Sequence, residues 1–341
     1  MTAKKEIAIT EAPEPGCVLP IPETVTLLGE DDFTETMQGA NKKWRDTCVH
    51  NGKFTTKDGM EINYYTAIPE NRRANLVILH GYCGFWAKYH EMAWYYYQAG
   101  YAVFFMEQRG HGYSGREVPE TDLVHVRSYE DYVRDTKEFF DRVVKAESGG
   151  KPCYLFAHSM GGAIGALFLG THPECFQKAV LSSPMIQMKT GKYPRALVNL
   201  LAVHATVHHM QRQMSVGQDH FSPVPVFGTS STLSRPRYDY VFQHRLQDFH
   251  YQTYGASYGW AMAGMSVTGK ILKRAANVTI PVLLFQAGND PLVEPSGQLR
   301  FARKASDVRI VRYEKSKHEI FNATEEIRRD YYARIFRFLE G

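Results

Sequence analysis

The stretch Cys153-Tyr154-Leu155-Phe156-Ala157-His158-Ser159-Met160-Gly161-Gly162 decides the fold. Its first half is a short apolar run typical of a buried strand, and its second half opens a segment of small residues with helical character. A serine at the junction of a strand and a helix stands on a sharp turn that lifts its hydroxyl clear of the sheet. We therefore predict a strand, a tight turn at Ser159 and a helix.

Small residues around Ser159 are what such a turn requires, because large side chains would collide with the neighbouring backbone. Gly161 meets this requirement. Ala157 departs by one methyl group from the usual G-x-S-x-G pattern, which loosens the motif without forbidding the turn. The N–H groups at the start of the helix would point at a reacting carbonyl. The motif alone remains a hypothesis that the flanking sequence must support.

On both sides of this stretch, short apolar runs alternate with segments of helical spacing. Such alternation indicates an α/β protein with a mostly parallel central sheet and helices on both faces. Before it, the turn dipeptide Asp58-Gly59 lies between two short alternating runs and predicts a hairpin. The expected strands are 54–56, 62–67, 76–79, 101–106, 153–157, 179–181, 281–287 and 308–313, and the expected helices are 89–98, 129–144, 163–169, 195–210, 260–275 and a C-terminal helix.

Changes of composition divide the chain. The first 43 residues carry four prolines and few bulky residues, which predicts irregular structure. The strand and helix rhythm stops after Ser183-Pro184 and resumes after about residue 255. The expected units are an irregular N-terminal arm (1–43), the first part of the α/β core (44–183), an inserted cap or lid (184–255) and the second part of the core (256–341).

Composition excludes several classes of protein. The 341 residues, 44% hydrophobic and 22% charged, are those of a globular protein with a large core. The net charge of +4 is spread without basic blocks, so nucleic acid is not an expected partner. The five scattered cysteines indicate free thiols in a reducing compartment. Because no signal peptide or bilayer-spanning run is visible, we expect a cytoplasmic location with at most peripheral membrane association.

Two further reactive side chains follow strands later in the chain. Asp290 follows the apolar run 281–287, and His318 follows 308–313. The order Ser159, Asp290, His318 is the chain order of α/β-hydrolase triads. In that arrangement the serine attacks, the histidine carries the proton and the aspartate orients the histidine, with no metal or organic cofactor. Glu294 is the alternative acid.

The strand at 76–79 ends in His80-Gly81-Tyr82, where a loop can present main-chain N–H groups. We predict that the N–H groups of Tyr82 and Met160 form an oxyanion hole. His80 is expected to be structural, because a general base must face the serine hydroxyl. His204 and His208 are four residues apart, but the glutamate of H-E-x-x-H is missing between them, so no metal site is predicted.

With these sites in place, the chain resembles the α/β hydrolases of the bacterial lysophospholipase and monoacylglycerol lipase group. The resemblance rests on residues 108–115 (QRGHGYSG), 157–162 (AHSMGG), 286–290 (QAGND) and 318–320 (HEI). Ala157 is common before the His-Ser pair of bacterial lysophospholipases. Glu107 departs from the group, which usually has aspartate there.

The resemblance implies an α/β-hydrolase fold whose cap covers an acyl site. It also implies hydrolysis of carboxylic acyl esters, most simply lysophospholipids or monoacylglycerols, with possible peripheral membrane contact through the cap. Two alternatives stay open at this point. The first is an amidase or peptidase that uses the same triad. The second is a ligand-binding protein of this fold without catalysis, since a fold alone does not determine function.

Overall fold

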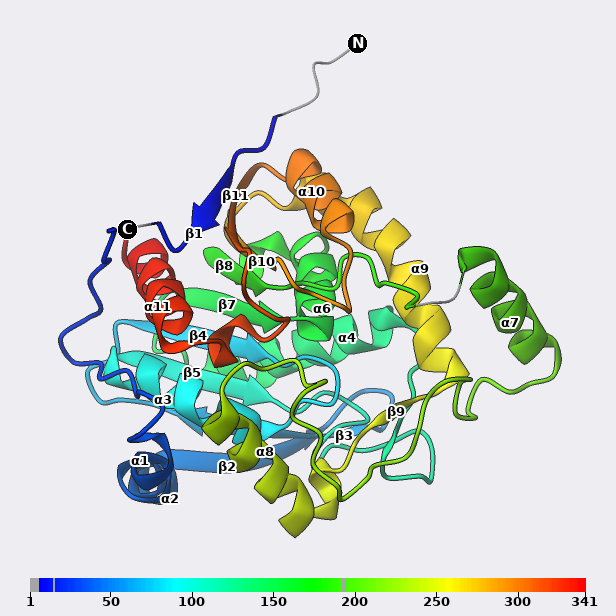
Figure 1. Ribbon diagram of the computed structural model, residues 1–341, viewed down its shortest axis with the longest axis horizontal. Helices are drawn as coiled ribbons and strands as arrows, with labels where there is room; N and C mark the ends of the chain where they lie inside the picture. The colour runs from blue at the N-terminus through cyan, green and yellow to red at the C-terminus, as the bar shows by residue number, and fades with distance from the viewer. Residues whose placement is uncertain (1–5, 15, 192–193) are drawn as a thin grey trace.

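The computed structural model describes residues 6–14, 16–191 and 194–341 (Figure 1). The strands are β1 (Ile9–Ala12), β2 (Val49–Thr55), β3 (Glu61–Ala67), β4 (Ala74–Leu79), β5 (Tyr101–Met106), β6 (Leu123–Val124), β7 (Cys153–His158), β8 (Lys178–Ser182), β9 (Gly255–Ala256), β10 (Pro281–Ala287) and β11 (Asp307–Tyr313). The α-helices are α1 (Phe33–Gln38), α2 (Ala40–Cys48), α3 (His90–Gln98), α4 (Tyr129–Phe139), α5 (Lys145–Glu147), α6 (Met160–Leu169), α7 (Arg195–Val207), α8 (Arg235–Gln247), α9 (Tyr258–Arg274), α10 (Pro295–Lys304) and α11 (Glu325–Glu340).

Within the described residues, nine strands form one sheet in the order β1-β11-β10-β8-β7-β4-β5-β3-β2. The β2–β3 and β3–β5 pairs are antiparallel, whereas all other neighbouring pairs of this sheet are parallel. The β2–β3 hairpin turns at Gly59, which has a φ of +88°. The predicted mostly parallel α/β sheet is therefore confirmed. A separate short pair joins β6 to β9.

Strand β4 shows why helices cover both faces of the sheet. Val77 and Leu79 belong to an apolar cluster with residues of α4, α6 and α9. Leu76 and Ile78 belong to a second cluster with residues of α3 and α11. Every residue of β4 is buried, as expected for a parallel strand between two layers of helices. Figure 1 shows α3 and α11 on one side of the sheet, and α4, α6 and α9 on the other.

The N-terminal residues 1–43 are not irregular throughout, which corrects the prediction. Strand β1 pairs in parallel with β11 at the edge of the sheet, with Ile9 opposite Ile310. Helix α1 buries Phe33 and Met37, and Phe33 contacts Tyr240 of α8 with ring centroids 5.7 Å apart. A four-residue strand and a six-residue helix are too short to show a hydrophobic period, so tertiary contacts decide both.

The segment 184–255 contains two described α-helices, of which one was predicted from the sequence and the other was not. Helix α7 lies close to its predicted range, and Figure 1 shows it projecting beside α9. Helix α8 was not predicted, because it lacks an apolar stripe: Arg237 is its one residue described as buried. Figure 1 shows α8 near β2 and α1, at a distance from α7. Helix α10 was also missed.

Candidate active site

Ser159 lies on the turn between β7 and α6, with φ +54° and ψ −116°. A positive φ costs a non-glycine residue roughly 1–3 kcal/mol, so the surroundings must hold it. The Ser159 N–H donates to the carbonyl of Ser182 at 3.0 Å, and the Ser159 carbonyl accepts from Met185 N–H at 2.9 Å. These bonds hold the turn against the next strand of the sheet.

Glycines on α6 make room for this turn. A Cβ at Gly161 would overlap the carbonyl oxygen of Leu79, and one at Gly162 would lie 2.6 Å from Cβ of Pro184. The extra methyl group of Ala157 is tolerated because the following turn of α6 carries Gly165. A Cβ added there would lie 3.0 Å from Cβ of Ala157.

Ser159, His318 and Asp290 form a continuous chain of hydrogen bonds. Ser159 Oγ lies 2.7 Å from His318 Nε2, and His318 Nδ1 lies 2.6 Å from Asp290 Oδ2. The other carboxylate oxygen accepts from the N–H groups of Leu292 and Val293 at 2.8 and 3.2 Å. Because a carboxylate faces Nδ1, the imidazole hydrogen resides there and the Nε2 lone pair faces the serine. Asp290, not the alternative Glu294, occupies the position beside His318.

The predicted oxyanion donors lie beside Ser159, Tyr82 on the loop after β4 and Met160 at the first position of α6. Gly81 must lack a side chain, because a Cβ there would lie 2.7 Å from His158 Nδ1. Among the described residues, no acceptor is found for the N–H group of Tyr82 or Met160. Both groups are therefore available to a reactant. The loop continues through Cys83, which has a φ of +54° and whose carbonyl accepts from Arg245 Nη2 at 3.0 Å.

His80 is fully buried and bonds to nearby backbone. Its Nε2 accepts from Gln108 N–H at 2.9 Å, and its Nδ1 lies 2.8 Å from the Gly81 carbonyl. Burial lowers the pKa of His80 to about 4, so the ring is neutral at pH 7. These contacts agree with the structural role expected for His80.

Glu107 stands where the group that this chain resembles usually has aspartate. Its carboxylate also supports the loop after β4. One carboxylate oxygen accepts from Trp86 N–H at 3.1 Å, and the other accepts from Tyr113 N–H at 2.8 Å and Asn63 Nδ2 at 3.0 Å. The longer side chain fits because Gly112 has no Cβ. A Cβ at that position would overlap the Glu107 carboxylate. Burial raises the pKa of Glu107 to about 7, although the three donors lower it.

Two lysines beside the site were missed by the sequence analysis. Lys88 Nζ lies 2.5 Å from Glu319 Oε1, in a largely buried ion pair that joins the Tyr82 loop to the neighbour of His318. Lys189 Nζ donates to the main-chain carbonyl of Asp290 at 2.6 Å. No local pattern marks these residues, because their partners are 231 and 101 positions away in sequence.

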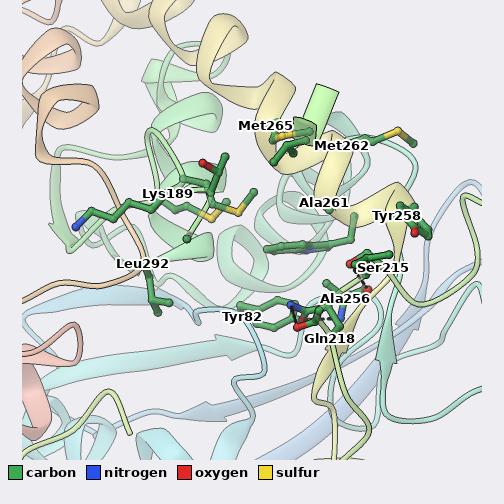
Figure 2. Close-up of a pocket in the computed structure, with 18 of the residues that line it drawn as sticks. Tyr82, Lys189, Ser215, Gln218, Ala256, Tyr258, Ala261, Met262, Met265 and Leu292 are labelled. Atoms are coloured by element: carbon green, nitrogen blue, oxygen red, sulfur yellow. Dashed lines mark hydrogen bonds between the residues drawn. The ribbon is translucent and has the colours of Figure 1, made fainter. Parts of the chain in front are cut away.

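A cavity of about 500 Å³ opens beside Ser159 (Figure 2). Trp260 and Tyr82 form part of its wall, with ring centroids 4.4 Å apart. Among the described lining residues, Lys189 is the one with a formal charge, and no carboxylate is present. The ammonium group of Lys189 is held by Asp290. The other apolar lining residues are Met185, Met188, Val198, Leu201, Ala202, Val216, Ala256, Ala261, Met262, Met265, Pro291, Leu292 and Val293.

His204 and His208 lie together on α7, with ring centroids 4.3 Å apart. In the part of the chain that the structure describes, no group of three or more His, Cys, Asp or Glu side chains is arranged to hold a metal ion. Likewise, none of the described helices combines the length and apolarity needed to cross a membrane.

The sheet and the Ser159 turn define an α/β hydrolase. The fold is shared with a thermostable carboxyl esterase from Bacillus coagulans, with a TM-score of 0.69 at 18% identity, over 86% of this chain and 99% of that one. The profile of the Hydrolase_4 family, described as "Serine aminopeptidase, S33", matches residues 70–325. The chain belongs to this family and is a serine hydrolase of the lipase and esterase type.

Relatives with similar sequences are also named as lipases or lysophospholipases. The chain is 28% identical to lysophospholipase L2 of Escherichia coli (strain K12) over 267 residues, which covers 78% of this chain and 77% of the relative. It is 26% identical to the monoacylglycerol lipase of Mycolicibacterium smegmatis (strain ATCC 700084 / mc(2)155) over 277 residues, or 80% of this chain and 91% of that protein. The predicted resemblance to these two groups is confirmed.

Proposed function

We propose that the protein hydrolyses carboxylic esters of long-chain acids, of the lysophospholipid or monoacylglycerol kind, through a covalent acyl-enzyme on Ser159. One observation carries the proposal: the hydrogen-bonded chain Ser159–His318–Asp290 opens directly into a cavity with mostly apolar walls. Such a cavity binds an acyl chain by removing apolar surface from water. The names of the lysophospholipase and lipase relatives support the same class of substrate.

In the first half of the reaction, Ser159 Oγ attacks the ester carbonyl carbon while His318 Nε2 takes its proton. Negative charge develops on the carbonyl oxygen, which accepts hydrogen bonds from the N–H groups of Tyr82 and Met160. The N-terminus of α6 adds a favourable dipole. Collapse of the intermediate breaks the ester C–O bond, and the departing alcohol takes the proton from His318.

In the second half, water attacks the acyl-enzyme and His318 takes a proton from it. The C–O bond to Ser159 breaks, the serine recovers its proton, and the fatty acid leaves. Asp290 holds the imidazole in one tautomer and stabilises its charged form during both halves. The bonds from Leu292 and Val293 to the second oxygen of Asp290 fix the orientation of this carboxylate.

The segment 184–255 acts as a lid in this proposal. Val198, Leu201 and Ala202 of α7 line the acyl cavity. Leu200 and Val203 of the same helix are 65% and 61% exposed. A helix with apolar residues toward both a lipid cavity and solvent suits contact with the surface of a lipid aggregate.

An aminopeptidase activity is the second candidate, because the family description names one. Such an enzyme must bind a substrate ammonium group, for which carboxylates are the natural partners. The described residues that line the cavity include no carboxylate, and Asp290 is engaged with His318, which favours esters. Turnover of a matched long-chain acyl ester and anilide separates the two, and a faster anilide reaction would reverse the assignment.

Labelling by a fluorophosphonate tests the nucleophile directly. The intact mass should rise by one phosphonyl group in the wild type and in Ser222→Ala, which changes an exposed serine of the cap, but not in Ser159→Ala. No labelling of folded wild-type protein, together with no ester turnover, would refute the proposal and favour the non-catalytic alternative.

Replacement of the acid tests the relay. Asp290→Asn should preserve the fold and lower kcat by up to about 10⁴-fold, because the imidazole would then adopt the wrong tautomer. Steady-state kinetics on a short soluble ester measures the effect, with Glu294→Gln as the matched control. Near-normal turnover by Asp290→Asn would show that another group supplies the acid.

A further inference from the structure

A second cavity, of about 410 Å³, lies over the β2–β3 hairpin and shares no described lining residue with the first. Its floor includes Val49 of β2 and a patch of four further side chains from β2 and β3. Asn51 pairs with Tyr65 and Lys53 pairs with Asn63 across the two strands, so all four point to the same face of the hairpin. Its walls come from α2, α3, α8 and the turns at Trp86–Tyr89 and Phe249–Tyr251.

One cation that lines the cavity, Arg45, has no carboxylate partner within ion-pair distance among the described residues. Arg45 of α2 is half-buried and donates to Asn41 Oδ1 at 2.9 Å and to the Met37 carbonyl at 3.4 Å. No acidic side chain of the described residues lies within ion-pair distance of Arg45, and none lines the cavity. Lys53, the other cation, is paired with Glu61 at 2.7 Å. A guanidinium group in this position favours an anionic ligand.

A buried nitrogen in the cavity wall lacks a partner. His90 is 3% exposed, and its Nδ1 lies 2.8 Å from the hydroxyl of Tyr240. Its Nε2 is buried and has no hydrogen-bond partner among the described residues. Burial, then the charge of Arg45, lowers the pKa of His90 well below its usual value, so the ring stays neutral. An unsatisfied buried polar atom is unfavourable, and a polar ligand that reaches Nε2 would relieve this cost.

Aromatic rings make up much of the remaining surface. Tyr65 stacks on Trp86 with ring centroids 4.9 Å apart and planes 11° apart. Tyr113 and Tyr251, which also line the cavity, meet edge to face with centroids 5.7 Å apart. Such rings suit a flat aromatic ligand by stacking or edge contacts.

We propose that this cavity is a binding site for a small aromatic carboxylate, with the carboxylate on Arg45 and the aromatic ring against Tyr65 and Tyr113. One uncompensated charge matches a monoanion, and the planar guanidinium can hold a carboxylate through two parallel hydrogen bonds. The site is separate from Ser159, so the inference does not depend on the proposed ester hydrolysis.

Binding of 2-naphthoate to the intact protein tests this inference by isothermal titration calorimetry. The wild type should bind at one site, and Arg45→Met should bind at least about tenfold more weakly, because a charge-assisted bidentate contact is lost. Arg329→Met, which removes an exposed arginine of α11 outside the cavity, should bind like the wild type. The uncharged analogue 2-naphthalenemethanol should bind the wild type at least about tenfold more weakly than naphthoate.

A second variant keeps the inference testable if Arg45→Met does not fold. Val49→Phe keeps every charge and narrows the cavity, which Val49 lines, and should also weaken naphthoate binding. Circular dichroism and thermal melting check that both variants fold. Unchanged affinity in a folded variant would overturn the inference. So would displacement of naphthoate by 1-decanol, a neutral ligand suited to the Ser159 cavity.

Discussion

Helices α7 and α8 belong to the same inserted segment but are held in opposite ways. Helix α7 packs against α9 and leaves Leu200 and Val203 largely in solvent. Helix α8 has a single residue described as buried, Arg237, which is 2% exposed. Helix α7 turns Val198, Leu201 and Ala202 toward the cavity, whereas α8 has no comparable apolar stripe. The difference shows that a buried polar network can position one helix of the inserted segment, while the other helix packs along the cavity beside Ser159.

The network around Arg237 joins four parts of the chain. Arg237 donates to Glu91 of α3 at 2.8 and 2.6 Å and to Glu30 of the N-terminal arm at 2.7 Å. Arg328 of α11 donates to the same Glu91 at 2.5 Å. At its other end, α8 contacts the loop after β4, which carries the predicted oxyanion donor Tyr82, through Arg245. We therefore regard α8 as part of the frame of the site and α7 as its cover.

Replacing Arg237, which anchors α8, should have the largest effect, a loss of folding stability. Arg237→Met removes one of the two arginines that pair with the buried Glu91 carboxylate. This loss should lower the free energy of unfolding by about 3–5 kcal/mol. The matched change on the other helix, Leu200→Ser, should alter it by less than about 0.5 kcal/mol, because the side chain is exposed. Urea denaturation measures both. Equal losses would remove the distinction between the helices.

Acid should weaken the frame through Glu91. Burial raises the pKa of Glu91, but Arg328 and Arg237 lower it more, so the folded pKa lies below the usual 4.5. The stabilisation is thus fully present above pH 4.5 and is lost as the pH falls through the lowered folded pKa. Thermal melting across this range should show a steeper loss in the wild type than in Glu91→Gln. Parallel curves would exclude Glu91 as the titrating group.

Loosening the contact between α8 and the oxyanion loop should affect turnover without affecting binding. Arg245→Met removes the hydrogen bond to the Cys83 carbonyl, so kcat should fall about tenfold with KM almost unchanged, less than for direct loss of an oxyanion donor. Arg235→Met, at the exposed start of α8, is the control. Because Arg245 acts through the loop, Arg245→Lys should restore part of kcat, and a purely KM effect would contradict this positioning role.

A charge on the exposed side of α7 should have the smallest effect, and only on aggregated substrate. Val203→Asp should leave hydrolysis of a short soluble ester unchanged and lower hydrolysis of monoacylglycerol in vesicles about threefold to tenfold, because apolar surface is lost from the interface. Comparing the two substrates in one series measures the difference. Equal rates of wild type and Val203→Asp on vesicles would show that α7 does not contact the lipid surface.

Eight of the nine strands of the large sheet and the three reactive residues were visible in the sequence because each carries a local signal. Buried parallel strands are short apolar runs, and Ser159, Asp290 and His318 each follow such a run. Helix α8 and strand β1 carry no such signal. Their positions depend on Arg237 meeting Glu91 and on β1 meeting the edge of β11, which are pairings between residues far apart in the chain.

The sequence by itself determined the α/β sheet, the order of the reactive residues and the turn at Ser159, since periodicity and small residues act over a few neighbours. Only the tertiary structure decided which carboxylate meets His318, how Glu107 replaces an aspartate and where the two cap helices lie. These features arise from contacts across large sequence separations, whose energies depend on burial and distance and leave no local pattern to read.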